Sequence, residues 1–256
     1  MALNWHGYTK EGPGVSKDEP RQKGFALFFS IYFRKFFDIM KLNLLYCLFC
    51  LPVVTIGPAT AAATYVLRHY VREQHAFVWG DFWKAFKENW KQGLFVGLFM
   101  TLAYVVLLCA VYFYSHFLSQ SGLLFIPLVV CAALLFLVAF MGNYLYLLLV
   151  TLELKIKPLF KNAAILALVG IKQNFLILFF SALVAVPLFL FFPWTAPILL
   201  FFGPTTVLFI QCFLADPLVQ KYCVNPFHPK QEPGEEPVFS DLPEEPLSSE
   251  RKAPWG

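Results

Sequence analysis

Long apolar stretches without a single Lys, Arg, Asp or Glu recur along the chain. They cover residues 93–117, 122–150, 174–192 and 194–215. A helix needs about 20 apolar residues to cross the hydrocarbon core of a bilayer, which is ~30 Å thick. Each stretch approaches or exceeds that length, so the pattern predicts four transmembrane helices.

A fifth apolar region, residues 36–67, is interrupted. Its middle reads "LPVVTIGPATAA" (51–62), with two prolines and a glycine. Proline inside a helix removes a backbone donor and clashes with the preceding turn, at about 3 kcal/mol. We therefore expect an amphipathic helix at about 24–39 and a broken helical hairpin at 40–71.

A different pattern precedes the first span. In "DFWKAFKENW" (81–90) aromatic side chains follow helical spacing on one side and charged side chains occupy the other. This pattern predicts an amphipathic interfacial helix at 80–92, with Asp81 as its N-cap. Such a helix is either an anchor that leads into the next span or a docking element for a cytoplasmic partner. The aromatic residues are Phe82, Trp83, Phe86 and Trp90, and the charged residues are Lys84, Lys87, Glu88 and Lys91.

Composition strengthens the membrane interpretation. The 256 residues are 59% hydrophobic and only 14% charged, whereas soluble domains are about 25% charged. The predicted fold class is an all-α polytopic membrane bundle occupying residues 25–228. Residues 1–24 are polar, and residues 229–256 form an acidic, Pro-rich tail that we expect to be disordered, because it has too little apolar surface to bury.

The positive charges divide into blocks. All 20 Lys and Arg residues lie in 1–41, 57–92, 151–173 or 216–256, and none lies in the loops 118–122 and 193–197. Positively charged loops are retained in the cytoplasm. The two uncharged loops are therefore expected outside, and both termini in the cytoplasm.

This charge distribution leaves two interpretations of how the interrupted region meets the membrane. Positive blocks stand on both sides of residues 42–56, so a segment that enters the membrane, breaks and returns would keep both on one side. Broken backbone at that depth must be covered by protein, and the small residues of "ATAAAT" (59–64) allow close helix packing. The alternative is one kinked helix with its N-terminus outside.

The same region carries a family resemblance. "KLNLLYCLFCLPVVTIGPATAAATYVL" followed by "DFWKAFKENWKQG" resembles the YesL-like family of bacterial membrane proteins, a domain family of unknown function. The resemblance covers about residues 25–95. The residues that carry it are Asn43, Leu51, Pro52, Thr55, Gly57, Pro58, Ala59, Asp81, Phe82, Phe86 and Asn89.

The resemblance implies a small multi-pass protein of the cytoplasmic membrane of Gram-positive-type bacteria. Genes of that family lie beside carbohydrate uptake systems of the ATP-binding-cassette (ABC) type, sensor kinases and glycan-degrading enzymes, and no reaction is established. We therefore expect a non-enzymatic accessory protein whose partner is an ABC-type sugar permease or a sensor kinase, with self-association also open. The alternative is a small stand-alone transporter or exporter, which the paired breaks at Gly57-Pro58 and Gly203-Pro204 would suit.

Candidate chemistry inside the chain is sparse. Cys47 and Cys50 share a helix face, but no second pair or histidine accompanies them, so we expect neither a metal site nor a disulfide. No cofactor loop or catalytic motif occurs, and membrane orientation explains the cationic excess without nucleic acid. Asn143 and Gln211 are polar residues within spans, where they either join helices or line a small polar site.

Overall fold

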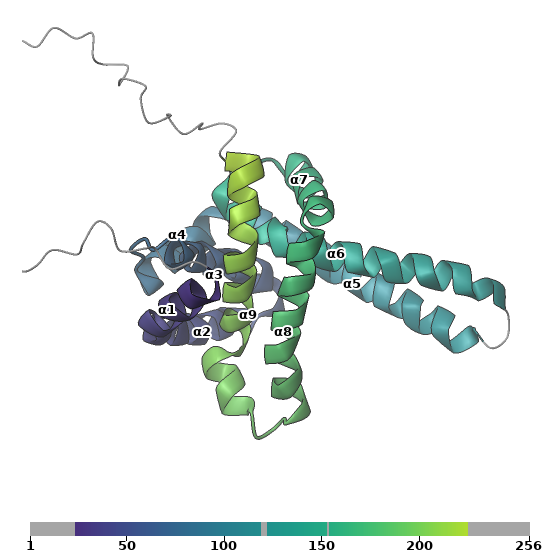
Figure 1. Cartoon of the computed structure of the whole chain (residues 1–256), viewed down its shortest axis with the longest axis horizontal. Coiled ribbons are helices and arrows are strands. Elements are labelled where there is room, and N and C mark those ends of the chain that lie inside the picture. The colour runs from purple at the N-terminus through teal and green to yellow at the C-terminus, as the bar shows by residue number, and fades with distance from the viewer. Residues whose placement is uncertain (1–23, 119–121, 153, 225–256) are drawn as a thin grey trace, which may run out of the picture.

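The computed structural model describes residues 24–118, 122–152 and 154–224, and all regular structure in them is helical (Figure 1). The segments 1–23 and 225–256, which include the predicted polar N-terminus and acidic tail, lie outside the described residues. The α-helices are α1 (Phe25–Arg34), α2 (Phe36–Cys50), α3 (Ile56–Val71), α4 (Val78–Glu88), α5 (Trp90–Phe117), α6 (Phe125–Thr151), α7 (Ile156–Val169), α8 (Ile171–Leu190) and α9 (Ala196–Val219). Short 3₁₀ turns η2 (Val53–Thr55) and η3 (Gly122–Leu124) precede α3 and α6, and a π turn η4 (Gln220–Val224) follows α9.

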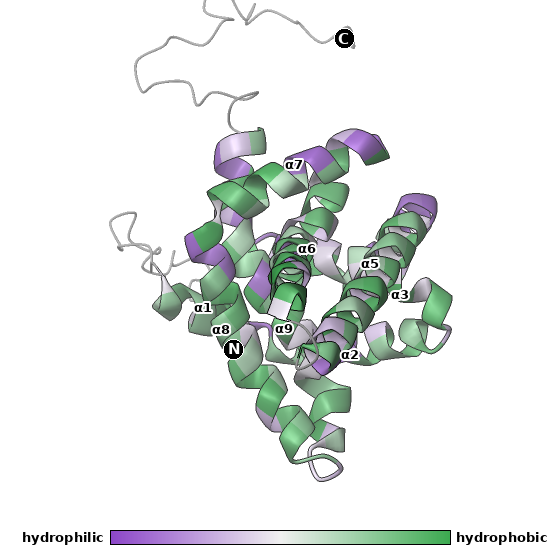
Figure 2. Cartoon of the chain, turned by 90° about the vertical axis from the view of Figure 1, so that its right-hand side faces the viewer, coloured by the Kyte–Doolittle hydropathy of each residue, from purple (hydrophilic) through white to green (hydrophobic). Residues whose placement is uncertain are grey.

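Four helices are long and apolar enough to cross a membrane, which confirms the predicted number of spans. They are α5, α6, α8 and α9, with η3 and η4 extending two of them. The pairs α5–α6 and α8–α9 form two hairpins that diverge from a common end (Figure 1). The ribbon of the α8–α9 hairpin is mostly hydrophobic towards its tip, and α7 carries hydrophilic stretches (Figure 2).

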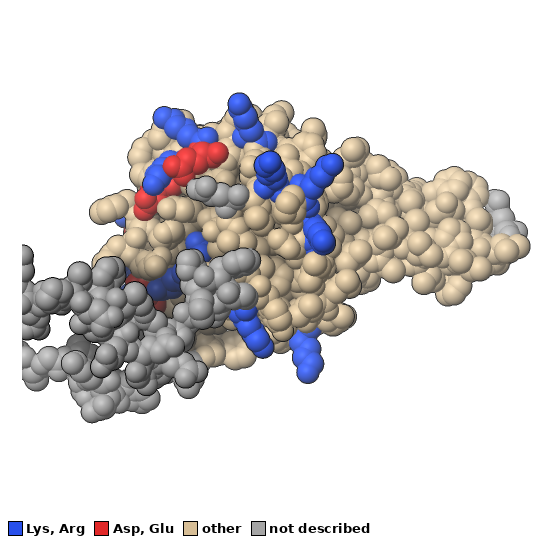
Figure 3. Space-filling view, turned by 90° about the horizontal axis from the view of Figure 1, so that it is seen from above, with Lys and Arg blue, Asp and Glu red and all other residues tan. Residues whose placement is uncertain are grey.

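We call the end where α4, α7 and the inner ends of both hairpins meet the base. Seen from above, Lys and Arg side chains stand over this part of the molecule, and the projecting α5–α6 hairpin carries none (Figure 3). The sequence agrees, since residues 92–152 and 173–215 contain no Lys, Arg, Asp or Glu. Charge is therefore separated from the hairpin tips in space as well as in sequence.

The helix predicted at 24–39 ends earlier, so that boundary was wrong. Lys35 leaves helical geometry at φ −104° and ψ 14°, which separates α1 from α2. Both helices place aromatic rings on α9: Phe28 lies 5.1 Å from Phe209, and Phe36 lies 4.8 Å from Phe202, between ring centroids. The bend at Lys35 allows the chain to follow α9 with aromatic contacts on either side of it.

The interrupted region folds back on itself. The hydroxyls of Tyr46 and Thr60 form a hydrogen bond at 3.1 Å, although fourteen residues of continuous helix would separate them by about 21 Å. At the other end of this hairpin, Arg34 pairs with Glu73 at 2.7 Å. The α2–α3 pair is thus a hairpin with both ends at the base, and the single kinked helix does not form.

The innermost helix is α3. Eleven of its sixteen residues are buried, and it contacts α2, α4, α5, α6 and α9. Alanine and threonine dominate its buried positions, so neighbouring helices approach its backbone closely. The core of the protein is built around this short helix rather than around the four long ones.

Two further boundaries differ from expectation. The helix predicted at 80–92 is α4, which begins after Phe77 and ends at Glu88, while Trp90 already belongs to α5. Asp81 therefore lies in the first turn rather than at the N-cap, and its carboxylate accepts the backbone N–H of Phe77 at 2.7 Å. From the first turn, the Asp81 side chain therefore satisfies a backbone N–H group at the start of the helix, as an N-cap side chain would.

Helix α7 was not expected. It buries Leu159, Ala163, Leu166 and Ala167, which follow the i, i+4, i+7, i+8 spacing of an amphipathic helix. Its lysines stay on the outer side, so a segment that reads as a charged loop packs along α6 at the base.

Candidate functional site

The turn between α2 and α3 is held by Thr55. Its hydroxyl donates to the backbone carbonyl oxygen of Phe49 and to that of Pro52, the latter at 2.6 Å. Phe49 carries one of the carbonyl groups that the end of α2 leaves free, and the Pro52 carbonyl also accepts the Thr55 N–H at 2.9 Å. The neighbouring side chains Val53 and Val54 are 74% and 68% exposed, so the hairpin presents an apolar, uncharged tip.

Gly57 and Pro58 begin α3 at a close helix crossing. Proline is tolerated there because the first turn has no intrahelical acceptor for its nitrogen. A Cβ on Gly97 would lie 2.7 Å from the Gly57 Cα, and a Cβ on Gly93 would lie 2.9 Å from the Pro58 Cα. The crossing therefore requires glycine on both helices, and "GLFVG" (93–97) is the small-xxx-small pattern that could have revealed it.

Asn43 lies on α2 and is fully buried. Its amide nitrogen donates to the carbonyl oxygen of Leu200 at 2.6 Å, and its amide oxygen accepts the backbone N–H of Thr205 at 2.9 Å. Pro204 interrupts α9 at this point, because it has no N–H for Leu200. The second Gly-Pro break, which would suit the alternative of a stand-alone transporter, is thus filled by a side chain of the α2–α3 hairpin.

A buried ionic cluster joins α3 to α9 at the base. The carboxylate of Asp216, whose side chain is 4% exposed, lies 3.4 Å from the Arg68 Nε and 3.3 Å from the Arg72 Nη2. Gln220 donates to the same carboxylate at 2.6 Å. Two guanidinium groups and one amide therefore surround a single buried anion, and all four side chains lie at helix ends.

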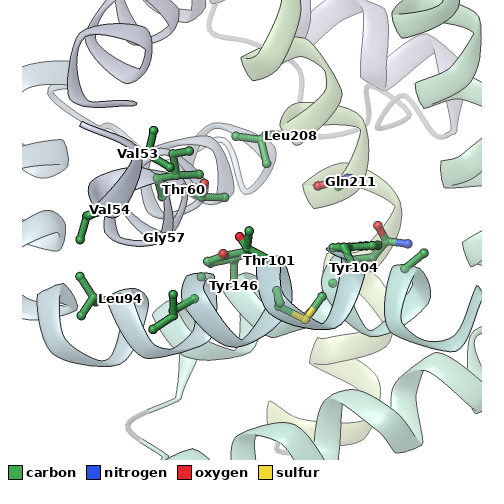
Figure 4. A pocket seen from close by; sticks show the side chains of 17 residues that line it. Val53, Val54, Gly57, Thr60, Leu94, Thr101, Tyr104, Tyr146, Leu208 and Gln211 are labelled. Carbon is green, nitrogen blue, oxygen red and sulfur yellow. Dashed lines mark hydrogen bonds between the residues drawn. The ribbon is translucent and has the colours of Figure 1, made fainter. Parts of the chain in front are cut away.

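A cavity of about 390 Å³ opens between the hairpin tip and the spanning helices (Figure 4). Asn143 of α6 and Gln211 of α9 both line it, and Asn143 also donates to Asn174 of α8 at 3.2 Å. Asn143 thus joins two helices and lines the cavity at once. Gly57 and Thr60 of α3 form part of the wall, which brings the resemblance motif to the edge of this cavity.

The motif residues of α4 lie elsewhere. Phe82 and Phe86 are buried against Phe49 of α2, with ring centroids 5.3 Å and 5.0 Å apart. Both rings therefore hold α4 to the bundle, whereas an interfacial anchor would turn them towards the lipid. Asn89, after the last turn of α4, donates to the carbonyl oxygen of Ala85 at 3.0 Å.

The outer face of α4 remains exposed. Phe77 and Trp79 are 81% and 64% exposed, and the Lys87 Nζ lies 4.8 Å from the centroid of the Trp83 ring. Lys84 and Glu88 line a second cavity, of about 650 Å³, between α4 and the end of α6. This surface combines aromatic and cationic side chains on a helix that its other face keeps fixed.

Metal-binding geometry is not found in the part of the chain that the structure describes: no three His, Cys, Asp or Glu side chains gather there. Cys47 and Cys50 are free thiols, and Asn43 lies within 3.8 Å of the Cys47 sulfur, where its amide can donate weakly.

Comparison with known proteins finds a family match over the same part of the chain as the residues that carry the resemblance. Residues 39–111 match the model of a family described as "Protein of unknown function, DUF624". The match runs from α2 through most of α5 and includes the tip, the glycine crossing and α4. No curated protein matches the chain. No solved structure matches it either.

Proposed function

We propose that this chain is a non-enzymatic accessory protein of a bacterial cytoplasmic membrane that works with an ABC-type carbohydrate permease or a sugar-sensing kinase. The resemblance of residues 25–95 to the YesL-like family motivates the carbohydrate link, and the family match over residues 39–111 is consistent with that resemblance. The structural support comes from the base of the molecule.

The orientation follows from charge. Both ends of the α2–α3 hairpin, both inner ends of the spanning pairs and α4 share the base, where the Lys and Arg residues gather. Because positively charged segments stay in the cytoplasm, the base faces the cytoplasm in this proposal, and the two hairpin tips face outward. The α2–α3 hairpin then enters the membrane from the cytoplasmic side and returns to it.

The strongest support for the accessory role is the exposed outer face of α4. Tryptophan is enriched at the centres of protein–protein interfaces, and here the exposed Trp79 stands on a helix whose inner aromatic rings are buried. A rigid surface with exposed Trp79 and Lys87 suits docking of a cytoplasmic partner. The same side chains would also suit contact with anionic lipid headgroups. Co-purification distinguishes lipid contact from partner docking.

The test is co-purification from the native host in mild detergent. The wild-type chain is expected to retain a permease component or a sensor kinase, and the double variant Trp79→Ala, Lys87→Glu to lose it while remaining in the membrane. The matched control is Lys157→Glu, an exposed charge reversal on α7, which should retain the partner. If the outer face of α4 instead contacts only lipid headgroups, the double variant should retain the same partner as the wild-type chain.

Two results would contradict the accessory role. The first is that no partner is retained and that deletion of the gene leaves sugar uptake and its induction unchanged. The second is solute flux in proteoliposomes that contain this chain alone, which would favour a stand-alone transporter instead.

A further inference from the structure

We propose that the cavity at the tip of the α2–α3 hairpin binds a small uncharged molecule with several hydroxyl groups. The inference goes beyond the accessory role, because it concerns a ligand within the bundle and not a partner at α4. It rests on the position of the cavity, on the hydrogen-bonding groups in its wall and on the absence of charge among them.

Four helices supply the polar part of the wall. Thr101 and Tyr104 come from α5. Together with Tyr146 of α6 they lie across the cavity from Gln211 of α9 (Figure 4). The cavity lies between α3, α5, α6 and α9, beside the tip residues Val53 and Val54 of the α2–α3 hairpin. The polar lining residues are Thr60, Thr101, Tyr104, Asn143, Tyr146 and Gln211.

Most of these groups are free to bind a ligand. Thr60 is engaged, because its hydroxyl donates to the carbonyl oxygen of Ile56 and pairs with Tyr46. By contrast, in the described part of the chain the structure shows no hydrogen bond for the side chains of Thr101, Tyr104, Tyr146 and Gln211. A hydroxyl group both donates and accepts, so several hydroxyls on one ligand match this mixed set.

The wall selects against two other classes of ligand. Each described residue that lines the cavity is uncharged, and an ion placed there would leave water without an opposite charge to compensate it. An acyl chain would cover the free hydroxyls and the Gln211 amide without offering them a hydrogen bond. The remaining class is polar and uncharged.

The volume limits the size of that ligand. Small-molecule sites measure roughly 300–1,000 Å³, and this cavity, at about 390 Å³, lies near the lower end. A single sugar ring or a polyol of similar size fits this limit. The tyrosine rings in the wall can also contact the C–H faces of such a molecule.

Binding is measured on the purified full chain in lipid nanodiscs, by calorimetry and by the shift of the thermal transition. The probes are glycerol, myo-inositol, D-glucose and maltose, and the charged comparators are D-gluconate and D-glucosamine. At least one uncharged probe is expected to bind and to raise the transition temperature. Gln211→Leu should weaken that binding at least tenfold, and Gln173→Leu, a matched change outside the cavity, should leave it unchanged.

Several outcomes would overturn the inference. They are that no uncharged probe binds, that gluconate or glucosamine binds as tightly, or that Gln211→Leu binds as the wild type does. As a second measurement, Gln211→Cys on a background without the six native cysteines should react with a small uncharged thiol reagent, and bound probe should slow the reaction. A thiol that does not react in the folded protein would show that polar solutes do not reach the cavity. Because the chain is studied alone, failure here is distinct from failure of partner docking.

Discussion

Asn43 completes the backbone hydrogen bonding of a helix that begins more than 150 residues later. Its amide donates to the carbonyl oxygen of Leu200 at 2.6 Å, the group that Pro204 leaves without an N–H. The same side chain accepts both the N–H and the hydroxyl of Thr205, at 2.9 Å and 2.8 Å. Asn43, one of the residues that carry the resemblance, therefore contributes to the fold through α9, which lies outside the matched residues 39–111.

Replacing Asn43 by Leu should destabilise the protein. The leucine would leave the carbonyl of Leu200 and the amide of Thr205 buried without partners, and an unsatisfied buried group costs about 1–3 kcal/mol. We expect the free energy of unfolding to fall by ~2–3 kcal/mol, measured by reversible unfolding in mixed micelles. Asn89→Leu is the control, because this partly buried amide bonds to Ala85 at the end of its own helix. Equal losses in the two variants would contradict the role of Asn43 in joining α2 to α9.

Gly57→Ala tests the helix crossing. The added methyl group would overlap the backbone carbonyl of Gly93 on α5, and overpacking of this kind typically costs about 1–3 kcal/mol. A lower thermal transition is therefore expected. Gly80→Ala is the matched control, because its Cβ would meet nothing closer than 3.8 Å. The crossing would be refuted if Gly57→Ala melted at the wild-type temperature.

Asp216→Asn tests the ionic cluster. The change leaves Arg68 and Arg72 without their counter-charge in a buried position, and removal of one partner from a buried ion pair costs about 3–5 kcal/mol. The variant should accumulate poorly and melt early in detergent. Glu73→Gln removes the partner of Arg34 in a pair whose side chains are about half exposed, so its effect should stay below about 1 kcal/mol. Similar losses in both variants would contradict a special role for Asp216.

The spanning helices and the break before α3 could be predicted because their signals are local. Uncharged apolar stretches close to or above about 20 residues indicate the spans, and Pro52 with Gly57-Pro58 indicates the break. Two local signals were also present but unused. They are the "GLFVG" pattern that meets Gly57 and the helical spacing of Leu159, Ala163 and Leu166 in α7.

The contacts that join distant helices could not be predicted. Nothing near Asn43 in the chain shows that its amide faces the carbonyl freed by Pro204, because this depends on how α2 and α9 pack. Asp216 directly follows an uncharged stretch of the sequence, but nothing there shows that its two arginine partners lie at the end of α3. Asn143 and Gln211 were recognised as polar residues within spans, yet only the packing of α6 against α9 and α5 places them around one cavity.

We propose that the α2–α3 hairpin enters the membrane and returns to the side from which it came. Single cysteines at Arg34 and Glu73 mark its two ends, whose side chains meet at 2.7 Å. Cysteines at Leu123 and Trp194, which are 78% and 89% exposed, mark the two outer tips. All four are made on a background without the native cysteines and treated with a membrane-impermeant maleimide.

In intact cells, we expect the reagent to label positions 123 and 194, and to label positions 34 and 73 only after the membrane is permeabilised. Labelling of position 34 in intact cells, with position 73 protected, would place the two ends of the hairpin on opposite sides of the membrane and contradict re-entry.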